Sequence, residues 1–308
     1  MAIDVTALSN YVEEKRLPLI AKSVLTSKTI DLVQLETGVK QDTALNLISA
    51  SVTFKNGASC GWNPTDGVEL SQRKLIPTFL KINQNFCDKS LLKKWASYEV
   101  KLAAGRETLP FEEAFMDAIA GEISESIEKM IWQGDSENLA GRIECDGYLK
   151  HLSAVGAGTI KETWAAGTTA YNRIKGVYNN LPARVVGKSD TVIFVSEGDY
   201  RQFIQELVAA NLYHFDPAYK DGEYTLPGTS VRVIAVAGLD GSDAGKADKM
   251  VGGRLSNFFY GVDAEDDKDT FDLWYSKDNQ EFRLAVNFAI STQVAYPNEI
   301  VLGEEEED

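Results

Sequence analysis

The chain has 308 residues, a formal net charge of −15 at pH 7 and a hydrophobic content of 44%. Such a composition is typical of a folded globular protein, and the length predicts one large domain or two medium ones. The acidic charge argues against a protein that wraps nucleic acid, because affinity for phosphates comes mainly from Lys and Arg. No run of residues approaches the roughly 20 apolar residues of a membrane span, so we expect no membrane-spanning helix.

Histidine and cysteine are sparse, which argues against most metal and redox sites. The two histidines are His151 and His214, so a multi-histidine metal site is not expected, and each is interpreted as structural. Cys60, Cys87 and Cys145 lack C-x-x-C spacing. This predicts neither a zinc site nor a disulfide framework, and it fits synthesis in a reducing cytosol. The first residues are polar and acidic, so no secretory signal peptide is expected.

The N-terminal residues 1–49 alternate short helical patterns with polar breaks. Their apolar residues are too scattered for a core, so we predict an arm that packs on a neighbour. Residues 50–80 predict a long β-hairpin, because strand-like stretches flank a Gly/Pro/Asp-rich run that begins with the turn signal at 55–57. An isolated two-stranded hairpin is marginally stable, so this excursion is also expected to lie against another surface.

Residues 88–134 are predicted to be helical, and the strongest prediction covers 109–134. Pro110 lies in the first turn, where its missing N–H costs little, and Gly134 provides the stop. Large apolar residues recur every four positions between them, which predicts a buried stripe on a helix roughly 35 Å long. The acidic opposite face is interpreted as solvated. The stripe is formed by Phe111, Phe115, Ile119, Ile123, Ile127 and Ile131.

The second half of the chain begins as a loop-rich region and continues as a small α/β unit over residues 190–262. A β-branched strand is predicted over 191–195, and Ser196 followed by Asp199 resembles the capping box that starts a helix. A polar loop rich in Gly, Asp and Lys interrupts the later part of the unit. Further strands are predicted over 224–226, 231–236 and 256–262.

The end of the chain is predicted to be β-structure. After a strand at 271–275, residues 282–294 alternate strictly between apolar and other side chains. A strand of this length spans roughly 45–50 Å, whereas a compact globule of this size has a radius of gyration of only about 19 Å. The comparison predicts a flattened or elongated molecule. The run of carboxylates from Glu304 to Asp308 predicts a disordered acidic tail.

One stretch fits the G-x-S-x-G pattern of a hydrolase nucleophile elbow, with Ser59 between Gly57 and Gly61. That motif needs a buried strand before it and a helix after it. Here the stretch lies at the tip of the predicted hairpin, and the following residues 62–64 contain Pro64 and do not start a helix. We interpret the match as a glycine-rich turn. A serine hydrolase that uses Ser59 stays open as a distant alternative.

Two polar loops resemble phosphate- or ion-binding sites but miss their defining residues. Residues 241–247 lack the spacing of a phosphate loop, and Ala247 replaces the Ser or Thr that would hold Mg²⁺. Residues 263–269 carry alternating carboxylates, but an EF-hand would need Gly in place of Lys268 and Glu in place of Trp274. Both loops are interpreted as solvated. No catalytic residue, cofactor or metal site is therefore predicted.

A group of aromatic residues follows the helix that starts after Ser196. We interpret it as a loop that packs on itself or on a neighbour, since a ligand cage has no further support in the sequence. The group consists of Tyr213, Phe215, Tyr219 and Tyr224.

The order of the predicted elements points to a known family more clearly than any motif does. The helix end IEKMIWQGD, the strand–helix stretch SDTVIFVSEGDYRQFIQEL and the closing stretch EFRLAVNFAISTQVAYPNEIVL each resemble parts of one fold. It is the Hong Kong 97-type fold of the major capsid proteins of tailed bacteriophages, and the resemblance covers essentially the whole chain. It implies an α+β fold and a structural protein that builds a shell, not an enzyme.

The resemblance also implies a division of the chain into parts. These are an N-terminal arm, an extended β-hairpin loop laid over an adjacent subunit, a peripheral domain with a long spine helix, an α/β axial domain and an acidic tail. The arm would cover residues 1–49 and the extended loop 50–80. The peripheral domain would cover 81–144 and 263–302, with the spine helix at 109–134. The axial domain would cover 145–262, and the acidic tail 303–308.

Partners and location follow from the same resemblance. The chain would form pentamers and hexamers of itself in an icosahedral shell that encloses double-stranded DNA without sequence-specific binding. Portal, scaffolding and decoration proteins are further expected partners, and the virion is the expected location after synthesis in the cytoplasm of a bacterial host. Some members of the family form a covalent Lys–Asn cross-link, but the sequence identifies no such pair. An encapsulin-like nanocompartment shell is the alternative with the same fold.

Overall fold

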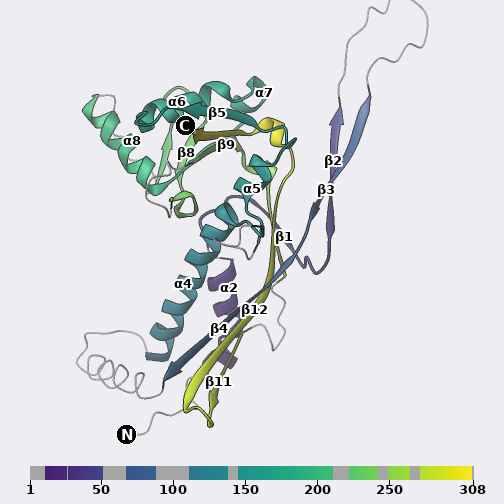
Figure 1. The fold of residues 1–308 in the computed structure, drawn as a ribbon, viewed down its shortest axis with the longest axis vertical. Coiled ribbons are helices and arrows are strands. Elements are labelled where there is room, and N and C mark those ends of the chain that lie inside the picture. The colour runs from purple at the N-terminus through teal and green to yellow at the C-terminus, as the bar shows by residue number, and fades with distance from the viewer. Residues whose placement is uncertain are drawn as a thin grey trace, which may run out of the picture.

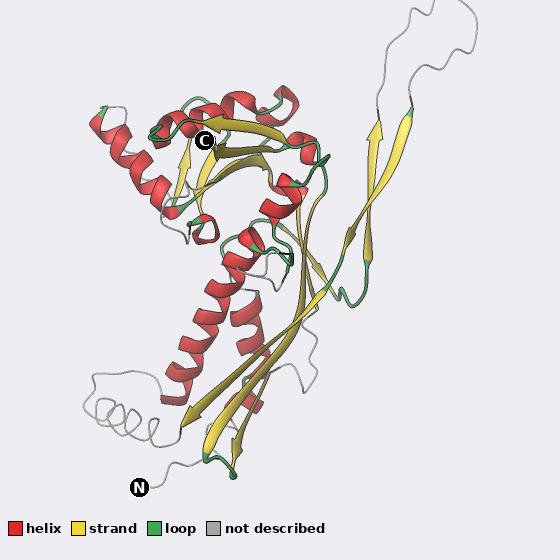
Figure 2. Cartoon of the chain, in the orientation of Figure 1, coloured by secondary structure: helices red, strands yellow, loops and turns green. Residues whose placement is uncertain are grey.

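The computed structural model consists of an elongated body and a ribbon that projects from it (Figure 1). The structure describes residues 11–25, 27–50, 67–87, 111–137, 145–210, 222–241, 249–263 and 271–306. The strands form a five-stranded sheet, a six-stranded sheet and the two-stranded ribbon. Helices lie beside both larger sheets (Figure 2). The fold is therefore of the α+β class, and the elongated shape agrees with the length of the predicted final strand.

The five-stranded sheet is organised around β12 (Glu281–Val294), the long strand predicted from its alternation. This strand pairs antiparallel with β4 (Thr78–Cys87). The first part of β12 also pairs with β11 (Phe271–Ser276), and the last part pairs with β10 (Phe258–Asp263). The short strand β1 (Gln34–Thr37) adds to β10 in parallel. The side chains of β12 are alternately more and less buried over its first half, as the period of two predicts.

The long helix α4 (Phe111–Gln133) packs beside this sheet and confirms the strongest helix prediction. Its buried stripe includes Ile123, which is 4% exposed, and Ile131, which is fully buried. The helix ends at Gly134, where a Cβ atom would overlap the backbone oxygen of Cys145. A glycine is therefore needed for the next segment to approach the helix end. The shorter helix predicted at 90–100 lies outside the described residues.

Within the predicted N-terminal arm, residues 11–25 and 27–37 pack on the body of their own chain. The helix α2 (Arg16–Val24) lies against α4, and its Val24 side chain is 1% exposed. Lys22 adds an ion pair to Asp117 of α4 at 2.7 Å. The buried apolar residues of this segment lie both on α2 and on either side of it, and a helix of 9 residues is too short to give a clear helical period.

The six-stranded sheet forms the other end of the body, in the strand order β5-β13-β9-β6-β8-β7 (Figure 1). Its strands are β5 (Ile160–Trp164), β6 (Thr191–Val195), β7 (Glu223–Thr225), β8 (Arg232–Ala235), β9 (Met250–Arg254) and β13 (Val301–Glu305). The helices beside it are α6 (Ala170–Asn180), α7 (Ala183–Val186) and α8 (Glu197–Ala209). The helix α5 (Tyr148–Ser153) contacts α4 and β12, and the 3₁₀ turns are η1 (Ala237–Leu239), η2 (Leu255–Asn257) and η3 (Pro297–Glu299).

The start of the predicted α/β unit is confirmed. The strand β6 is buried along its whole length. At the beginning of α8, the Ser196 side chain accepts a hydrogen bond from the backbone N–H of Asp199 at 2.9 Å. This bond satisfies one of the free N–H groups of the first helical turn.

The prediction of a disordered acidic tail from residue 303 is wrong for residues 303–306. The segment Val301–Glu305 is β13, which lies between β5 and β9 in the interior of the six-stranded sheet. The Glu304 carboxylate accepts hydrogen bonds from Lys161 at 2.9 Å and from Lys249 at 3.0 Å. The two lysines offset the charge that suggested disorder. Residues 307–308 lie outside the described part of the chain.

A common hydrophobic core joins the two larger sheets. Near the end of α4, the Trp132 ring lies 4.9 Å from the Phe194 ring of β6 and 5.4 Å from the Tyr148 ring of α5. Phe258 of β10 lies 5.2 Å from Tyr148. These edge-to-face contacts are a favourable geometry for aromatic rings. Because the rings come from both sheets, the body behaves as one packed unit at this junction.

The ribbon consists of β2 (Thr43–Ala50) and β3 (Val68–Leu75), which pair antiparallel. These strands flank residues 51–66, which lie outside the described residues. The strand predicted to start at Val68 is confirmed by β3, whereas the first predicted strand, at 51–54, lies outside the described residues. The strand β2 lies within residues 1–49, which were predicted as the arm. After β3 the chain passes Pro77 and enters the body as β4, a strand that the sequence reading left unassigned beyond Phe79.

Candidate assembly surfaces and a candidate pocket

One face of the ribbon exposes large apolar side chains. Ile48 and Leu70 are partners across the two strands and are 63% and 77% exposed. Val68, two residues before Leu70 and therefore on the same face, is 64% exposed. We call these three residues the outward patch. Contiguous exposed apolar surface of this kind marks a site at which another surface binds.

The opposite face of the ribbon is covered at its base. Leu45 and Leu75 are 9% and 0% exposed, and they pack with Val39 and with Phe259 of β10. Successive side chains of a strand point to opposite faces, so the buried residues and the outward patch alternate along the same strands. The inner face of the ribbon therefore packs on the body at its base, and the outer face is exposed to solvent.

Two side chains of the body hold the ribbon by its backbone. The Ile48 N–H donates to the Tyr296 hydroxyl oxygen at 3.2 Å, and that hydroxyl is also 3.2 Å from the Ile48 carbonyl oxygen. The Gln293 side-chain amide donates to the Lys74 carbonyl oxygen at 2.8 Å. The sequence reading missed both residues, because a bond from a side chain to a backbone group leaves no pattern in the residues that receive it.

Further large apolar side chains are exposed where the ribbon joins the body and on the five-stranded sheet. Ile76 and Phe79 flank Pro77 and are 61% and 74% exposed, and Trp274 of β11 is 41% exposed. They add to the exposed apolar area of the ribbon and its junction with the body.

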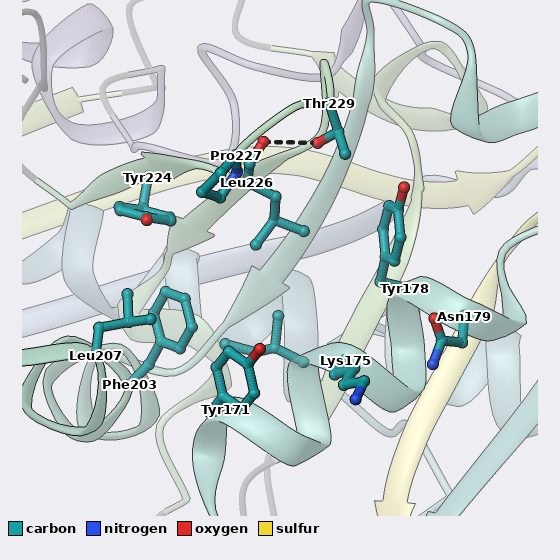
Figure 3. A pocket seen from close by; sticks show the side chains of 11 residues that line it. Tyr171, Lys175, Tyr178, Asn179, Phe203, Leu207, Tyr224, Leu226, Pro227 and Thr229 are labelled. Carbon is teal, nitrogen blue, oxygen red and sulfur yellow. Dashed lines mark hydrogen bonds between the residues drawn. The ribbon is translucent and has the colours of Figure 1, made fainter. Parts of the chain in front are cut away.

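A pocket of about 450 Å³ lies between α6, α8 and the β7 edge of the six-stranded sheet. Figure 3 shows the rings of Tyr171 and Tyr178 on α6 across from Phe203 and Leu226. Tyr224, from the aromatic group noted in the sequence, also lines the pocket, whereas its other members lie outside the described residues. The volume is that of a small-ligand site. Among the described lining residues there is no Asp, Glu, His or Cys to act as an acid–base group or nucleophile.

A buried polar network fixes the spacing of the two helices that line the pocket. Both guanidinium Nη atoms of Arg173 on α6 donate to the Asp199 carboxylate of α8, at 3.2 and 2.5 Å. These side chains are only 8% and 5% exposed. The Glu206 carboxylate of α8 accepts from the backbone N–H groups of Ala170 and Tyr171, at 3.2 and 2.7 Å. The pocket therefore has rigid walls and a hydrophobic lining.

The residues weighed for chemistry in the sequence are not brought together into a site by the described structure. Ser59 of the G-x-S-x-G stretch, Cys60 and His214 lie outside the described residues, as do 242–248 and 264–270, which contain most of the two polar loops. Within the part of the chain that is described, no group of three or more His, Cys, Asp or Glu side chains could hold a metal ion. No described helix is long and apolar enough to cross a membrane.

The remaining histidine and cysteines lie apart from the pocket. His151 lies on α5, where burial lowers its pKa although Asp146 acts in the opposite direction. The imidazole is therefore neutral at pH 7. Cys87 is exposed at the end of β4, and Cys145 is buried beside the end of α4.

A charged cluster ties the end of α4 to the start of α5. Lys150 lies 2.8 Å from both Asp135 and Asp146. The hydrogen bond from Lys150 holds the pKa of Asp135 below its usual range. Burial raises the pKa of Asp146, but hydrogen bonds from Lys150 and Ser136 outweigh burial and lower it. The cluster strengthens the junction of the two sheets.

Comparison with solved structures relates the whole chain to proteins of viral and virus-like particles. A chain of the satellite phage P4 procapsid, in a structure that includes the size determination (Sid) protein, is 13% identical with a TM-score of 0.60, over 96% of this chain and 91% of that chain. A chain from Gordonia phage Cozz is 11% identical with a TM-score of 0.55, over 92% and 87%. A virus-like particle from Pyrococcus furiosus is 11% identical with a TM-score of 0.50, over 98% and 100%.

These likenesses establish the fold. No protein-family model matches the sequence, and no curated protein matches it either. Because the sequence identities are low, the likeness shows architecture and nothing finer. The chain has the Hong Kong 97-type capsid fold, as the order of its predicted elements indicated.

Proposed function

We propose that this chain is the major capsid protein of a tailed bacteriophage, which assembles with copies of itself into an icosahedral shell around double-stranded DNA. The observation that carries the proposal is the outward patch of the ribbon, on a chain whose fold is shared with phage capsid proteins. The partner of the patch is a second copy of the chain. The ribbon corresponds to the extended loop expected to lie over an adjacent subunit.

The shape of the ribbon suits ring formation. A ribbon that projects from one subunit and binds a different surface of the next subunit makes a heterologous contact. Repeated contacts of this kind close into a ring when the rotation between neighbouring subunits divides a full turn evenly. Fully burying one Val, Leu or Ile side chain contributes roughly 1.5–3 kcal/mol. The outward patch thus supplies a modest contact that becomes strong when it is repeated around a pentamer or hexamer.

Within this proposal, the peripheral and axial domains follow the two larger sheets. The five-stranded sheet and α4 form the peripheral domain, and the six-stranded sheet forms the axial domain. The axial domain then ends before β10 and not at 262, because β10 pairs with β12. It also includes β13, because that strand pairs with β5 and β9.

We propose a structural role and no enzymatic one. The described lining of the pocket is mainly hydrophobic and contains no Asp, Glu, His or Cys, so its ionisable side chains are Lys175 and the tyrosines. A hydrolase that uses Ser59 is the distant alternative. An esterase signal abolished by Ser59→Ala, from a protein that stays monomeric at high concentration, would support the hydrolase and contradict the shell.

Portal, scaffolding and decoration proteins are proposed as further partners, and the virion as the location. The charge of −15 supports a container that encloses DNA without gripping it, because a net acidic subunit supplies few cationic contacts to phosphates.

The direct test is electron microscopy of the purified protein and of particles from the native source. We expect closed shells of uniform diameter, and nuclease-protected double-stranded DNA inside the native particles. Protein-filled particles without DNA would favour an encapsulin-like nanocompartment. A soluble monomer at all concentrations would contradict both shell functions.

A further inference from the structure

The contact between Tyr296 and the ribbon has an unusual geometry. In an antiparallel pair, the N–H and C=O of one residue point to the same side of the strand. The Tyr296 hydroxyl bonds both groups of Ile48, each at 3.2 Å. These two groups therefore point away from β3, toward the edge of β2 that has no strand partner among the described residues. Tyr296 occupies this edge much as a neighbouring strand would.

The Gln293 side chain makes the corresponding contact with the other strand. Its amide donates to the carbonyl oxygen of Lys74 in β3 at 2.8 Å. Gln293 and Tyr296 are three residues apart in the chain, yet each holds a different strand of the ribbon. Their contacts are with the backbone, so they constrain the position of the ribbon whatever side chains it carries.

The Tyr296 backbone is itself held in place. Pro297 follows it and restricts its backbone conformation. The Glu299 N–H donates to the Tyr296 carbonyl oxygen at 3.0 Å. The Glu299 carboxylate in turn accepts from Asn257 at 3.2 Å and pairs with Arg184 at 3.3 Å. Tyr296 thus lies in an ordered connection between β12 of one sheet and β13 of the other.

Among the described residues, the ribbon is also joined to the body by the chain itself, by an apolar cluster and by contacts of β3 with β12. Two chain connections join it to the body, at 38–42 and at 76–77. One small apolar cluster covers its base, formed by Val39, Leu45, Leu75 and Phe259. A cluster of this size limits lateral movement of the base and leaves the angle of the ribbon to be set by directional bonds.

We propose that Tyr296, assisted by Gln293, is a positioning residue that sets the angle at which the ribbon leaves the body. The outward patch of Ile48, Val68 and Leu70 is then presented in a defined direction before any partner binds. Pre-organisation of this kind lowers the entropic cost of association. The effect on assembly rests on the proposed function, whereas the effect on the ribbon is a property of the single subunit.

The first test measures amide hydrogen exchange on the isolated subunit. Tyr296→Phe removes the hydroxyl and keeps the ring, so we expect the Ile48 amide to exchange about 3- to 10-fold faster, as for the loss of an ordinary hydrogen bond. Amides of β6 and β12 should not change. Tyr178→Phe is the matched control, because it removes a hydroxyl from α6 and should leave Ile48 exchange unaltered. Equal Ile48 exchange in wild type and Tyr296→Phe overturns the proposal.

The second test measures assembly by light scattering at a fixed subunit concentration. Tyr296→Phe should assemble several-fold more slowly into shells of normal diameter, and Tyr178→Phe should assemble at the wild-type rate. An unchanged assembly rate despite faster Ile48 exchange would overturn the link between ribbon angle and association. If the wild type forms no shells, the proposed function fails, and the exchange experiment still decides the role of Tyr296.

Discussion

The body and the ribbon use the same alternation of side chains with opposite results. In the body, the inward residues Phe282, Leu284 and Val286 of β12 are at most 1% exposed. In the ribbon, Ile48 and Leu70 alternate in the same way but are more than 60% exposed. Alternation thus predicts that a strand has an apolar face, and it does not predict what covers that face. For the body the cover comes from the same chain, whereas the outer face of the ribbon is exposed on the single chain.

The largest expected effect is the loss of the folded body. Ile123→Asp places an unpaired charge in the buried stripe of α4, where the side chain is 4% exposed. Burying such a charge costs several kcal/mol, against a total stability of about 5–15 kcal/mol. We expect no soluble folded protein, measured by circular dichroism and gel filtration. Ala118→Asp, at an exposed position of the same helix, should fold normally. A folded Ile123→Asp variant would refute the assignment of the buried face.

The second-largest expected effect is the loss of the contact between the ribbon and another subunit, without loss of the fold. Leu70→Asp puts a charge in the outward patch, so the subunit should fold with an unchanged melting temperature but form few or no shells by electron microscopy. Gln72→Asp is the matched control, because it adds the same charge two residues further on the same face. Normal shells from Leu70→Asp would mean that the outward patch is not an interface.

A third prediction concerns the buried pair between α6 and α8. Arg173→Ala leaves the Asp199 carboxylate without its main partner, and breaking a buried ion pair in this way costs about 3–5 kcal/mol. The free energy of unfolding, measured in urea, should fall by this amount. Arg201→Ala on the exposed face of α8 should change it by less than about 0.5 kcal/mol. An equal small loss in both variants would show that the pair contributes little.

The smallest effect concerns acid stability. Burial raises the pKa of Glu304, but hydrogen bonds from Lys161 and Lys249 outweigh burial and lower it, and the pKa of Asp135 is lowered as well. A lowered carboxyl pKa stabilises the fold above the ordinary value near ~4, and this stability is lost as the pH falls through the lowered pKa.

The melting temperature should therefore be nearly constant from pH 7 to about 5 and should decrease below about pH 4. Glu304→Gln should lower the melting temperature by a few degrees at pH 7 and reduce its dependence on pH below 4. A melting temperature that rises on acidification would contradict the sign of these shifts.

Long, regular elements could be predicted from the sequence. The stripe of isoleucines gave α4, the strict alternation gave β12, and the Ser196 cap gave the start of α8. The order of these elements was enough to indicate the fold. Each of these elements is specified either by a periodic pattern of many residues or by a local hydrogen bond. Both depend on residues that are close together in the sequence.

Features that depend on distant contacts could not be predicted. A disordered tail is predicted from residue 303 because the carboxylates are adjacent in the sequence, whereas Lys161 and Lys249, which pair with Glu304, are far away in it. The packing of α2 within the predicted arm 1–49 could not be foreseen, because α4, which it contacts, is about 90 residues further along the chain. Tyr296 had no signal at all, since it binds the backbone of a residue that any side chain could occupy.

The position of β13 has a consequence for the order of events during synthesis. The edge strand β5 (Ile160–Trp164) has β13 as its strand neighbour in the described sheet, so it stays unpaired until residues 301–305 have been made. At roughly 5–20 residues per second, a ribosome needs about 7 to 27 seconds to cover that interval. Throughout this time the six-stranded sheet is incomplete. Completion of the six-stranded sheet therefore has to wait until residues 301–305 have been synthesised.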